Sequence, residues 1–206
     1  MNANGRITED QLRIVPANAA SAEDVQVIFA EGDAATRCQC QWFRCTPAEH
    51  RTTSREQRID RLDRQAHFGE RGAATTTGLV AYFADEPVGW CAVAPRSTYI
   101  RLLGSRVVWA GREEDPDDDS VWTVSCFVTR RGYRRRGISY ALARAAVEFA
   151  RERGAKAVEG YPIITGPGKE AGWAALFVGA STAFTDAGFV EITRPTARRA
   201  VMRVEF

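Results

Sequence analysis

The sequence has little net charge, no long apolar run and only two histidines. No apolar segment is long enough to cross a membrane, and the polar N-terminus, MNANGRITEDQL, lacks the apolar core of a secretory signal. We therefore expect a cytoplasmic protein that does not enter a membrane. His50 and His67 each stand alone in a charged segment, and we assign neither of them a catalytic role.

The charges are almost balanced, with 28 basic and 26 acidic residues and a net charge of +2. A nucleic-acid-binding domain usually carries a broad basic face, so this balance counts against nucleic acid as a partner. A chain of 206 residues that is 45% hydrophobic can bury one good core. We expect a flexible tail over residues 1–10 and a single domain over residues 11–206.

Five cysteines are an odd number, which argues against a disulfide framework. Three of them, Cys38, Cys40 and Cys45, lie close together, but a zinc site needs about four ligands and His50 gives an irregular spacing. We expect these thiols to pack as small apolar groups beside Trp42 and Phe43, and we predict no metal site.

The most informative stretch runs from Val121 to Glu152. An apolar run, VWTVSCFVTR, is typical of a buried strand, and residues 138–149 carry apolar side chains along one face of a helix. Between them lies a turn with two glycines and five arginines. Free N–H groups and the macrodipole at a helix start attract anions. The stretch therefore predicts a phosphate-bearing ligand on the turn from Arg134 to Ser139.

The remaining segments alternate between strands and helices. Ser21 caps an expected helix, and Thr46-Pro47-Ala48-Glu49 starts another that we expect to continue to about Phe68. Residues 78–94 form a hairpin candidate. The acidic run at 113–119 is either a solvated insertion or a device that attracts cations. Further strands are expected at 155–163, 189–193 and 198–206, with a helix over 173–187.

This order of elements resembles the GNAT superfamily of acyl-CoA-dependent N-acyltransferases. The superfamily signature is Gln/Arg-x-x-Gly-x-Gly/Ala, and the chain has Arg134-Arg135-Arg136-Gly137-Ile138-Ser139, with Ser139 departing at the last position. A Gly188-Phe189 pair follows about fifty residues later. The resemblance covers residues 11–206. It implies an α+β fold: a mixed, mostly antiparallel sheet of about six to seven strands, with flanking helices and a splayed parallel pair in the middle.

The resemblance also implies acetyl-CoA as co-substrate. Main-chain groups of the opening strand would pair with the pantetheine arm as if it were an added strand, and the turn would hold the pyrophosphate. The residues expected to bind the coenzyme are Phe127, Val128, Thr129, Arg134, Arg135, Arg136, Gly137, Ile138 and Ser139.

Catalysis is harder to assign. Many family members carry a tyrosine four residues before the glycine of the Gly-Phe pair, which protonates the departing thiolate, but this chain has Phe184 there. Ser181, Tyr161, other hydroxyls or water are the candidate substitutes. Glu159 is the first candidate for the general base, with the acidic run second, although a strand glutamate can also simply pair with an arginine.

Three functions follow as hypotheses. The first is an N-acetyltransferase that moves an acetyl group from acetyl-CoA to a primary amine of a small molecule or peptide by direct attack. The second is a regulatory module that binds acyl-CoA without turnover. The third, a nucleic-acid binder, is disfavoured by the charge balance. The expected partners are acyl-CoA and an amine acceptor, and the oligomeric state, a homodimer included, stays open.

Overall fold

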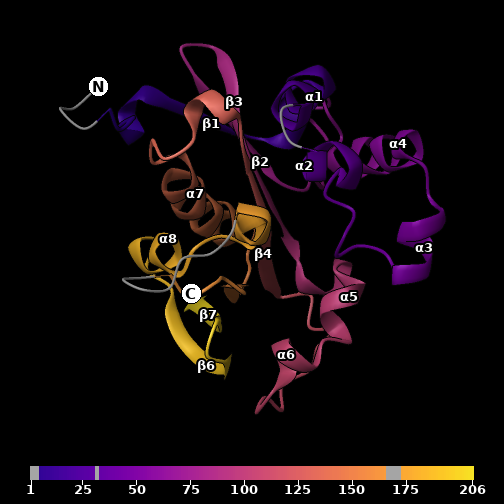
Figure 1. Ribbon diagram of the computed structural model, residues 1–206, viewed down its shortest axis with the longest axis vertical. Helices are drawn as coiled ribbons and strands as arrows, with labels where there is room; N and C mark the ends of the chain where they lie inside the picture. Colours follow the sequence, from indigo (N-terminus) through magenta and orange to yellow (C-terminus); the bar gives the residue numbers. More distant parts are fainter. Residues whose placement is uncertain (1–4, 31–32, 166–172) are drawn as a thin grey trace.

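The fold is a seven-stranded sheet with helices on both faces (Figure 1). The computed structural model describes residues 5–30, 33–165 and 173–206. The strand order is β1-β2-β3-β4-β5-β7-β6. The β4–β5 pair is parallel and the other neighbours are antiparallel. The expected α+β fold with a parallel pair inside a mostly antiparallel sheet is confirmed.

The strands are β1 (Leu12–Pro16), β2 (Leu79–Phe83), β3 (Glu86–Pro95), β4 (Val121–Thr129), β5 (Ala157–Gly160), β6 (Val190–Thr196) and β7 (Arg199–Glu205). The α-helices are α1 (Ala22–Ala30), α2 (Asp33–Cys38), α3 (Pro47–Thr52), α4 (Arg55–Ala66), α5 (Ile100–Leu103), α6 (Arg106–Trp109), α7 (Ile138–Glu152) and α8 (Ser181–Asp186). Short 3-10 helices are η1 (Glu9–Gln11), η2 (Ala17–Ala19), η3 (Arg96–Thr98), η4 (Arg131–Tyr133) and η5 (Trp173–Val178).

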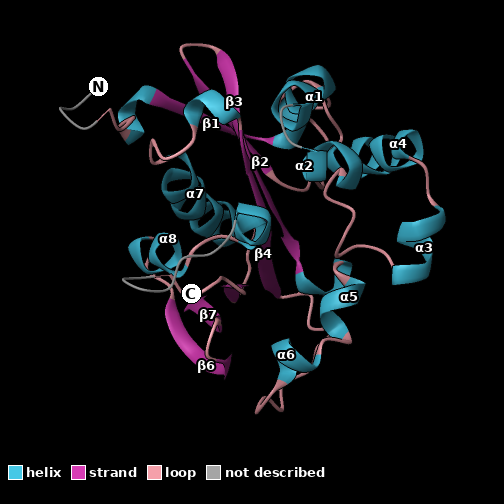
Figure 2. Cartoon of the chain, in the orientation of Figure 1, coloured by secondary structure: helices cyan, strands magenta, loops and turns pink. Residues whose placement is uncertain are grey.

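Helices lie on both faces of the sheet (Figure 2), and the two larger hydrophobic cores lie beneath them, one on each face. Helix α7 covers one face, where its apolar stripe includes Leu142 and Ala146, both completely buried. Helices α1 and α4 cover the other face and enclose Trp90 of β3. The amphipathic pattern over residues 138–149 is the reason that α7 buries one side against the sheet. No helix in the described part of the chain is long and apolar enough to cross a membrane.

Strands β4 and β5 stop pairing about halfway along β4. Their parallel pairing runs from Val121↔Ala157 to Val124↔Gly160 and ends there, while β4 continues beside β3 as far as Thr129. The register against β3 shifts between Cys126 and Val124, so the intervening Ser125 is a bulge residue. A bulge at this point bends β4 where the two parallel strands separate.

Two helix expectations are wrong. The helix expected from Thr46 to about Phe68 is divided into α3 and α4, because Ser54 accepts from the N–H of Gln57 and forms a second capping box. The helix expected over 173–187 is divided into η5 and α8. Gly179 lies between them with a φ of 86°, a left-handed conformation that interrupts a right-handed helix.

Residues 5–10, the second half of the tail expected to be flexible, are held by contacts with the rest of the chain. Ile7 is buried in the core under α7, and its main-chain N–H donates to the carbonyl oxygen of Arg136 at 2.9 Å. The Thr8 main-chain N–H donates to the side chain of Gln11, which closes a capping box at η1. Residues 5–8 therefore lie against the arginine-rich turn, while residues 1–4 are outside the described part.

Candidate coenzyme and acyl-transfer site

The arginine-rich turn has the backbone geometry of an anion site. Gly137 has a φ of 93° and is the N-cap of α7, and Arg135 has a φ of 59°. The carbonyl oxygen of Gly137 accepts from the N–H groups of Tyr140 and Ala141, which begins the helix. The N–H groups of Ile138 and Ser139 belong to the first turn, where intrahelical acceptors are lacking. They and the helix dipole favour a negative charge at this end of α7.

A cavity of about 380 Å³ lies at this end of α7. Residues expected to bind the coenzyme line it together with three that were not expected. The lining consists of Arg6, Thr129, Tyr133, Arg135, Gly137, Ile138, Ser139 and Tyr140. A polar cavity bounded by arginine and by first-turn N–H groups fits the pyrophosphate of coenzyme A.

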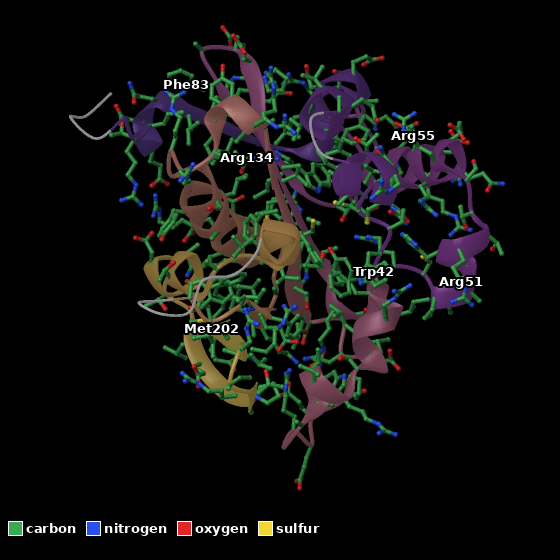
Figure 3. The ribbon with its side chains drawn as sticks, viewed as in Figure 1. Trp42, Arg51, Arg55, Phe83, Arg134 and Met202 are labelled. Atoms are coloured by element: carbon green, nitrogen blue, oxygen red, sulfur yellow. The ribbon has the colours of Figure 1, made fainter. Side chains whose placement is uncertain are left out.

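The arginines of the turn differ in their surroundings. Arg134 lies at the same end of the sheet as Phe83, away from Trp42 (Figure 3), and its Nε donates to the carbonyl oxygen of Thr129. Arg136 donates to the carbonyl oxygen of Gly5 and lies over the ring of Phe83. The structure thus places Arg135 in the cavity, whereas Arg134 and Arg136 brace the turn and the N-terminal segment.

Arg6 is the cavity residue that was least expected from the sequence. Its guanidinium lies 5.0 Å from the centre of the Tyr140 ring, and its Nε would be 3.3 Å from a Cβ added at Gly137. It reaches the turn because Ile7 is anchored in the core. The pattern Arg6-Ile7, a basic residue beside an isolated apolar one, was the available signal within an otherwise polar N-terminus.

The second half of β4 extends from the cavity toward the point where β4 and β5 separate. Phe127, Val128 and Thr129 pair with β3 on one side, opposite Cys91, Trp90 and Gly89. On the other side, the pairing of β5 with β4 stops at Val124, so β5 contributes no partner strand to these three residues in the described structure. This edge of β4 can therefore accept an extended ligand by main-chain hydrogen bonds, as expected for a pantetheine arm.

Phe184 presents no polar group to this edge of β4. Its ring is completely buried and packs edge-on against Phe127 and Phe189, with centroids 5.8 and 4.9 Å away. A Cβ added at Gly160 would lie 2.2 Å from its Cε1 atom. The side chain at the position of the usual family tyrosine is therefore a packing residue between α8 and the end of β5.

Glu159 is completely buried in a cluster of arginines. Its Oε1 accepts from Arg96 Nη1 at 3.1 Å and from the Tyr161 hydroxyl at 2.5 Å, and its Oε2 accepts from Arg112 Nη2 at 2.7 Å. Burial, followed by the charge of Glu159, raises the pKa of Tyr161 well above its usual value, so the phenol stays protonated. Glu159 therefore pairs with arginine, which was the alternative to a general-base role. The geometry favours a structural role.

The acidic run participates in the same cluster. Glu114 lies within 3.3 Å of Arg96, 3.0 Å of Arg112 and 2.7 Å of Arg203. The Arg96 guanidinium also donates to the carbonyl oxygens of Asp115 and Pro116. The segment between β3 and β4 is therefore tied to the sheet by ion pairs, so Glu114 is not part of a freely solvated insertion.

Ser181 lies outside the cavity at the turn. Its Oγ accepts from the N–H of Thr165 at 3.3 Å, and the side chain lines a second cavity of about 380 Å³ together with Thr185 and Glu191. That lining shares no residue with the cavity at the turn. Ser181 therefore does not line the cavity at the turn.

Two of the three clustered cysteines are buried, as expected, but the aromatic partner of Cys40 is Trp90 and not Trp42, which is exposed. Cys40 and Cys45 are buried; Cys40 Sγ accepts from the indole N–H of Trp90 at 3.0 Å, and the Cys45 thiol donates to the carbonyl oxygen of Gln41. All five cysteines are free thiols. Within residues 5–30, 33–165 and 173–206, no group of three or more His, Cys, Asp and Glu side chains is arranged to hold a metal ion.

Solved structures similar to this fold include acetyltransferases. Similar structures include a GCN5-related N-acetyltransferase from Kribbella flavida, at 15% identity and a TM-score of 0.53 over 97% of this chain and 100% of that one. A ribosomal-protein-alanine N-acetyltransferase from Brucella melitensis is also similar, at 18% identity and a TM-score of 0.51 over 94% of this chain and 99% of that one. A search of curated proteins found no match.

At these identities the structural likeness establishes the fold alone. The sequence itself matches the model of the acetyltransferase (GNAT) family over residues 39–161, which is more than half of the chain. The matched range contains β4, the arginine-rich turn and α7. The chain belongs to the acetyltransferase (GNAT) family.

Proposed function

We propose that the protein is an N-acetyltransferase that moves the acetyl group of acetyl-CoA to a primary amine of a small molecule or peptide by direct attack. The observation that carries this proposal is that Thr129 both lines the cavity at Gly137 and belongs to the part of β4 that does not pair with β5. Members of the family use acetyl-CoA as co-substrate. The N–H groups from Arg135 to Ser139, with the Arg6 and Arg135 side chains, would hold its pyrophosphate.

The pantetheine arm would lie along the main chain of Phe127, Val128 and Thr129. That position brings the thioester to the region where β4 bulges and β5 turns away. A main-chain N–H on this part of β4 would polarise the thioester carbonyl. The acceptor amine, in its uncharged form, attacks the carbonyl carbon, and no covalent cysteine intermediate is required.

The test is coenzyme A thiol release with a panel of amines, run with the wild type and two glycine variants. Gly137→Glu places a carboxylate where the phosphates would bind, at a φ of 93° and beside Arg6. We expect it to abolish acetyl-CoA binding, measured by calorimetry. Gly132→Glu is the matched control, because it also adds a carboxylate to the turn but no atom lies within 4 Å of the added Cβ.

Acetyl-CoA binding by the wild type without thiol release from any amine would favour a regulatory module instead. Unchanged affinity in Gly137→Glu would overturn the assignment of the phosphate site. Circular dichroism of both variants shows whether any loss reflects unfolding.

A further inference from the structure

The gap between β4 and the end of β5 contains a segment of the chain itself. The residues after β5 keep the register with β7 as far as Ile163, which pairs with Arg199. On its other side, Ile163 pairs in parallel with Ala180. The Ile163 N–H donates to the Gly179 carbonyl oxygen at 3.0 Å, and the Ser181 N–H donates to the Ile163 carbonyl oxygen at 2.8 Å. The chain that leads into α8 therefore lies on the side of Ile163 that faces β4.

This segment takes the place that β4 would have if it continued to pair with β5. In the β4–β5 register, Ile163 would lie opposite Phe127. Its partner is Ala180 instead, and a Cβ added at the neighbouring Gly179 would lie 2.9 Å from Phe127 Cε2. Residues 176–180, which we call the wedge, therefore lie between the two separated strands.

The wedge leaves no room for an added strand beside β4. Its first three residues belong to η5, and Cα atoms of η5 lie within 8 Å of Cα atoms of β4 (Figure 1). A strand inserted between two backbones needs two strand spacings, about 10 Å. Among the described residues, no main-chain hydrogen bond joins the wedge to β4. The wedge and the pantetheine arm of the proposed function therefore compete for the same edge.

Aromatic rings on both faces of the sheet contact the wedge. The Phe177 ring lies 6.0 Å from the Phe43 ring, centre to centre, and Phe43 packs on the buried cluster that contains Tyr161. Tyr161 is three positions from Val158 of the α7 core, so it faces the other side of the sheet. Phe127, which the wedge also contacts, belongs to the α7 core. The wedge thus passes through the gap and does not merely lie over one face.

We propose that the wedge closes the pantetheine site of the free protein and that coenzyme A displaces it. The arm then takes the place of the wedge between Phe127 and Ile163. The hydrogen bonds of Ile163 to the wedge and the Phe43–Phe177 contact open, and the arm pairs with β4 in return. Gly179, with a φ of 86°, is the hinge next to α8. This inference rests on the proposed function, because it concerns the same pantetheine site.

Loosening the wedge should strengthen coenzyme A binding. Only the fraction of molecules with an open gap can bind, which raises the apparent Kd. Phe177→Leu removes the ring contact with Phe43, and the Phe177 side chain is 36% exposed, so the variant should fold. We expect the Kd for coenzyme A, measured by calorimetry, to fall about two- to tenfold, the equivalent of one aromatic contact. A residue that only lined the site would weaken binding when removed.

Two controls isolate the wedge from other effects. The 3′-phospho-ADP part of coenzyme A fits the phosphate turn but lacks the pantetheine arm, so Phe177→Leu should leave its Kd unchanged. Phe68→Leu is the matched variant, because the Phe68 ring packs against Trp90 at 6.3 Å in the core under α1 and α4. We expect it to bind both ligands like the wild type. An unchanged or higher Kd for coenzyme A in Phe177→Leu would overturn the proposal.

Hydrogen exchange of the wild type measures the displacement directly. The Gly179 N–H donates to the Leu176 carbonyl oxygen at 2.9 Å, and the Ser181 N–H is bonded to Ile163. With coenzyme A bound, we expect faster exchange in peptides that cover residues 176–181 and slower exchange over residues 127–129. The armless 3′-phospho-ADP should slow exchange at the turn alone. Slower or unchanged exchange over residues 176–181 with coenzyme A would show that the wedge stays in place.

The outcomes separate the two proposals. Failure of the wild type to bind coenzyme A overturns both of them. Binding and thiol release without faster exchange over residues 176–181 overturn the wedge and leave the acetyl transfer intact. Binding with faster exchange there, but no thiol release from any amine, supports the wedge and overturns the acetyl transfer.

Discussion

The Tyr161 hydroxyl donates a 2.5 Å hydrogen bond to Oε1 of Glu159, two residues earlier in the chain. Both side chains are buried, and Glu159 also binds Arg96 and Arg112 from the segment between β3 and β4. The end of β5 is thus fixed to that segment by charge as well as by packing. This connection holds the segment between β3 and β4 against the end of β5.

Glu159→Gln is expected to destabilise the fold. The side chains of Glu159 and Arg96 are both 0% exposed, and removing one partner of a buried ion pair leaves an uncompensated charge. We expect a loss of about 3 kcal/mol or more in the free energy of unfolding, measured by urea denaturation. Glu148→Gln is the control, because its pair with Arg151 lies at the surface and should contribute little.

The same variant tests whether Glu159 is a base. With both oxygens bound by guanidinium groups, Glu159 should contribute to folding rather than to proton removal, so kcat per folded molecule should fall less than about tenfold. An unchanged unfolding midpoint combined with a large loss of kcat would restore Glu159 as the general base.

Arg6→Ala is expected to weaken coenzyme A binding by roughly tenfold, the value for loss of one charge-assisted hydrogen bond. Arg6 lines the cavity at the turn, so the loss should appear in the Kd for coenzyme A and diminish at high salt. Pantetheine, which has no phosphates, should bind both proteins equally. Arg151→Ala, at the far end of α7, is the control, and a similar loss there would contradict the assignment.

The arginine-rich turn was predictable from the sequence because its signal is local. The strand, the glycine at a helix start and the apolar stripe of α7 all lie within one stretch, and each depends on neighbouring residues. Similarly, the division of α3 from α4 was readable from Ser54 and Gln57, whose capping box spans three residues.

The parts that were missed depend on contacts between distant residues. Arg96 reaches Glu159 across 63 positions, and Arg136 binds Gly5 across 131. No periodicity or capping pattern encodes such a pairing. The burial of the Tyr99 side chain is likewise a property of the packed cluster, because an aromatic residue in a sequence does not show which groups surround it.

Acid should weaken the attachment of the segment between β3 and β4. Partial burial raises the pKa of Glu114, but hydrogen bonds from Arg203 and Arg112 outweigh this and the net shift is downward. A depressed pKa contributes stability above the unfolded value of about 4.3, and this contribution is lost as the pH falls through the lower folded value. Because the side chain is 35% exposed, we expect at most about 1 kcal/mol.

Glu114→Gln tests this dependence. The variant should melt at a lower temperature than the wild type at pH 7, and the two curves should converge as the pH falls below 4. Glu113→Gln, with an exposed side chain next along the chain, is the control. A difference that is constant from pH 7 to pH 3 would show that the charge of Glu114 does not contribute.

Gly160→Ala tests the packing that replaces the usual tyrosine. The added Cβ would lie 2.2 Å from Phe184 Cε1, so the ring or the end of β5 must move, and we expect a cost of about 1–3 kcal/mol in unfolding free energy. Gly72→Ala, where no atom lies within 4 Å of the added Cβ, should change little. In Gly160→Ala/Phe184→Leu the smaller side chain makes room, so the double variant should lose less than the sum of the single losses. Strict additivity would mean that Phe184 and Gly160 do not share this space.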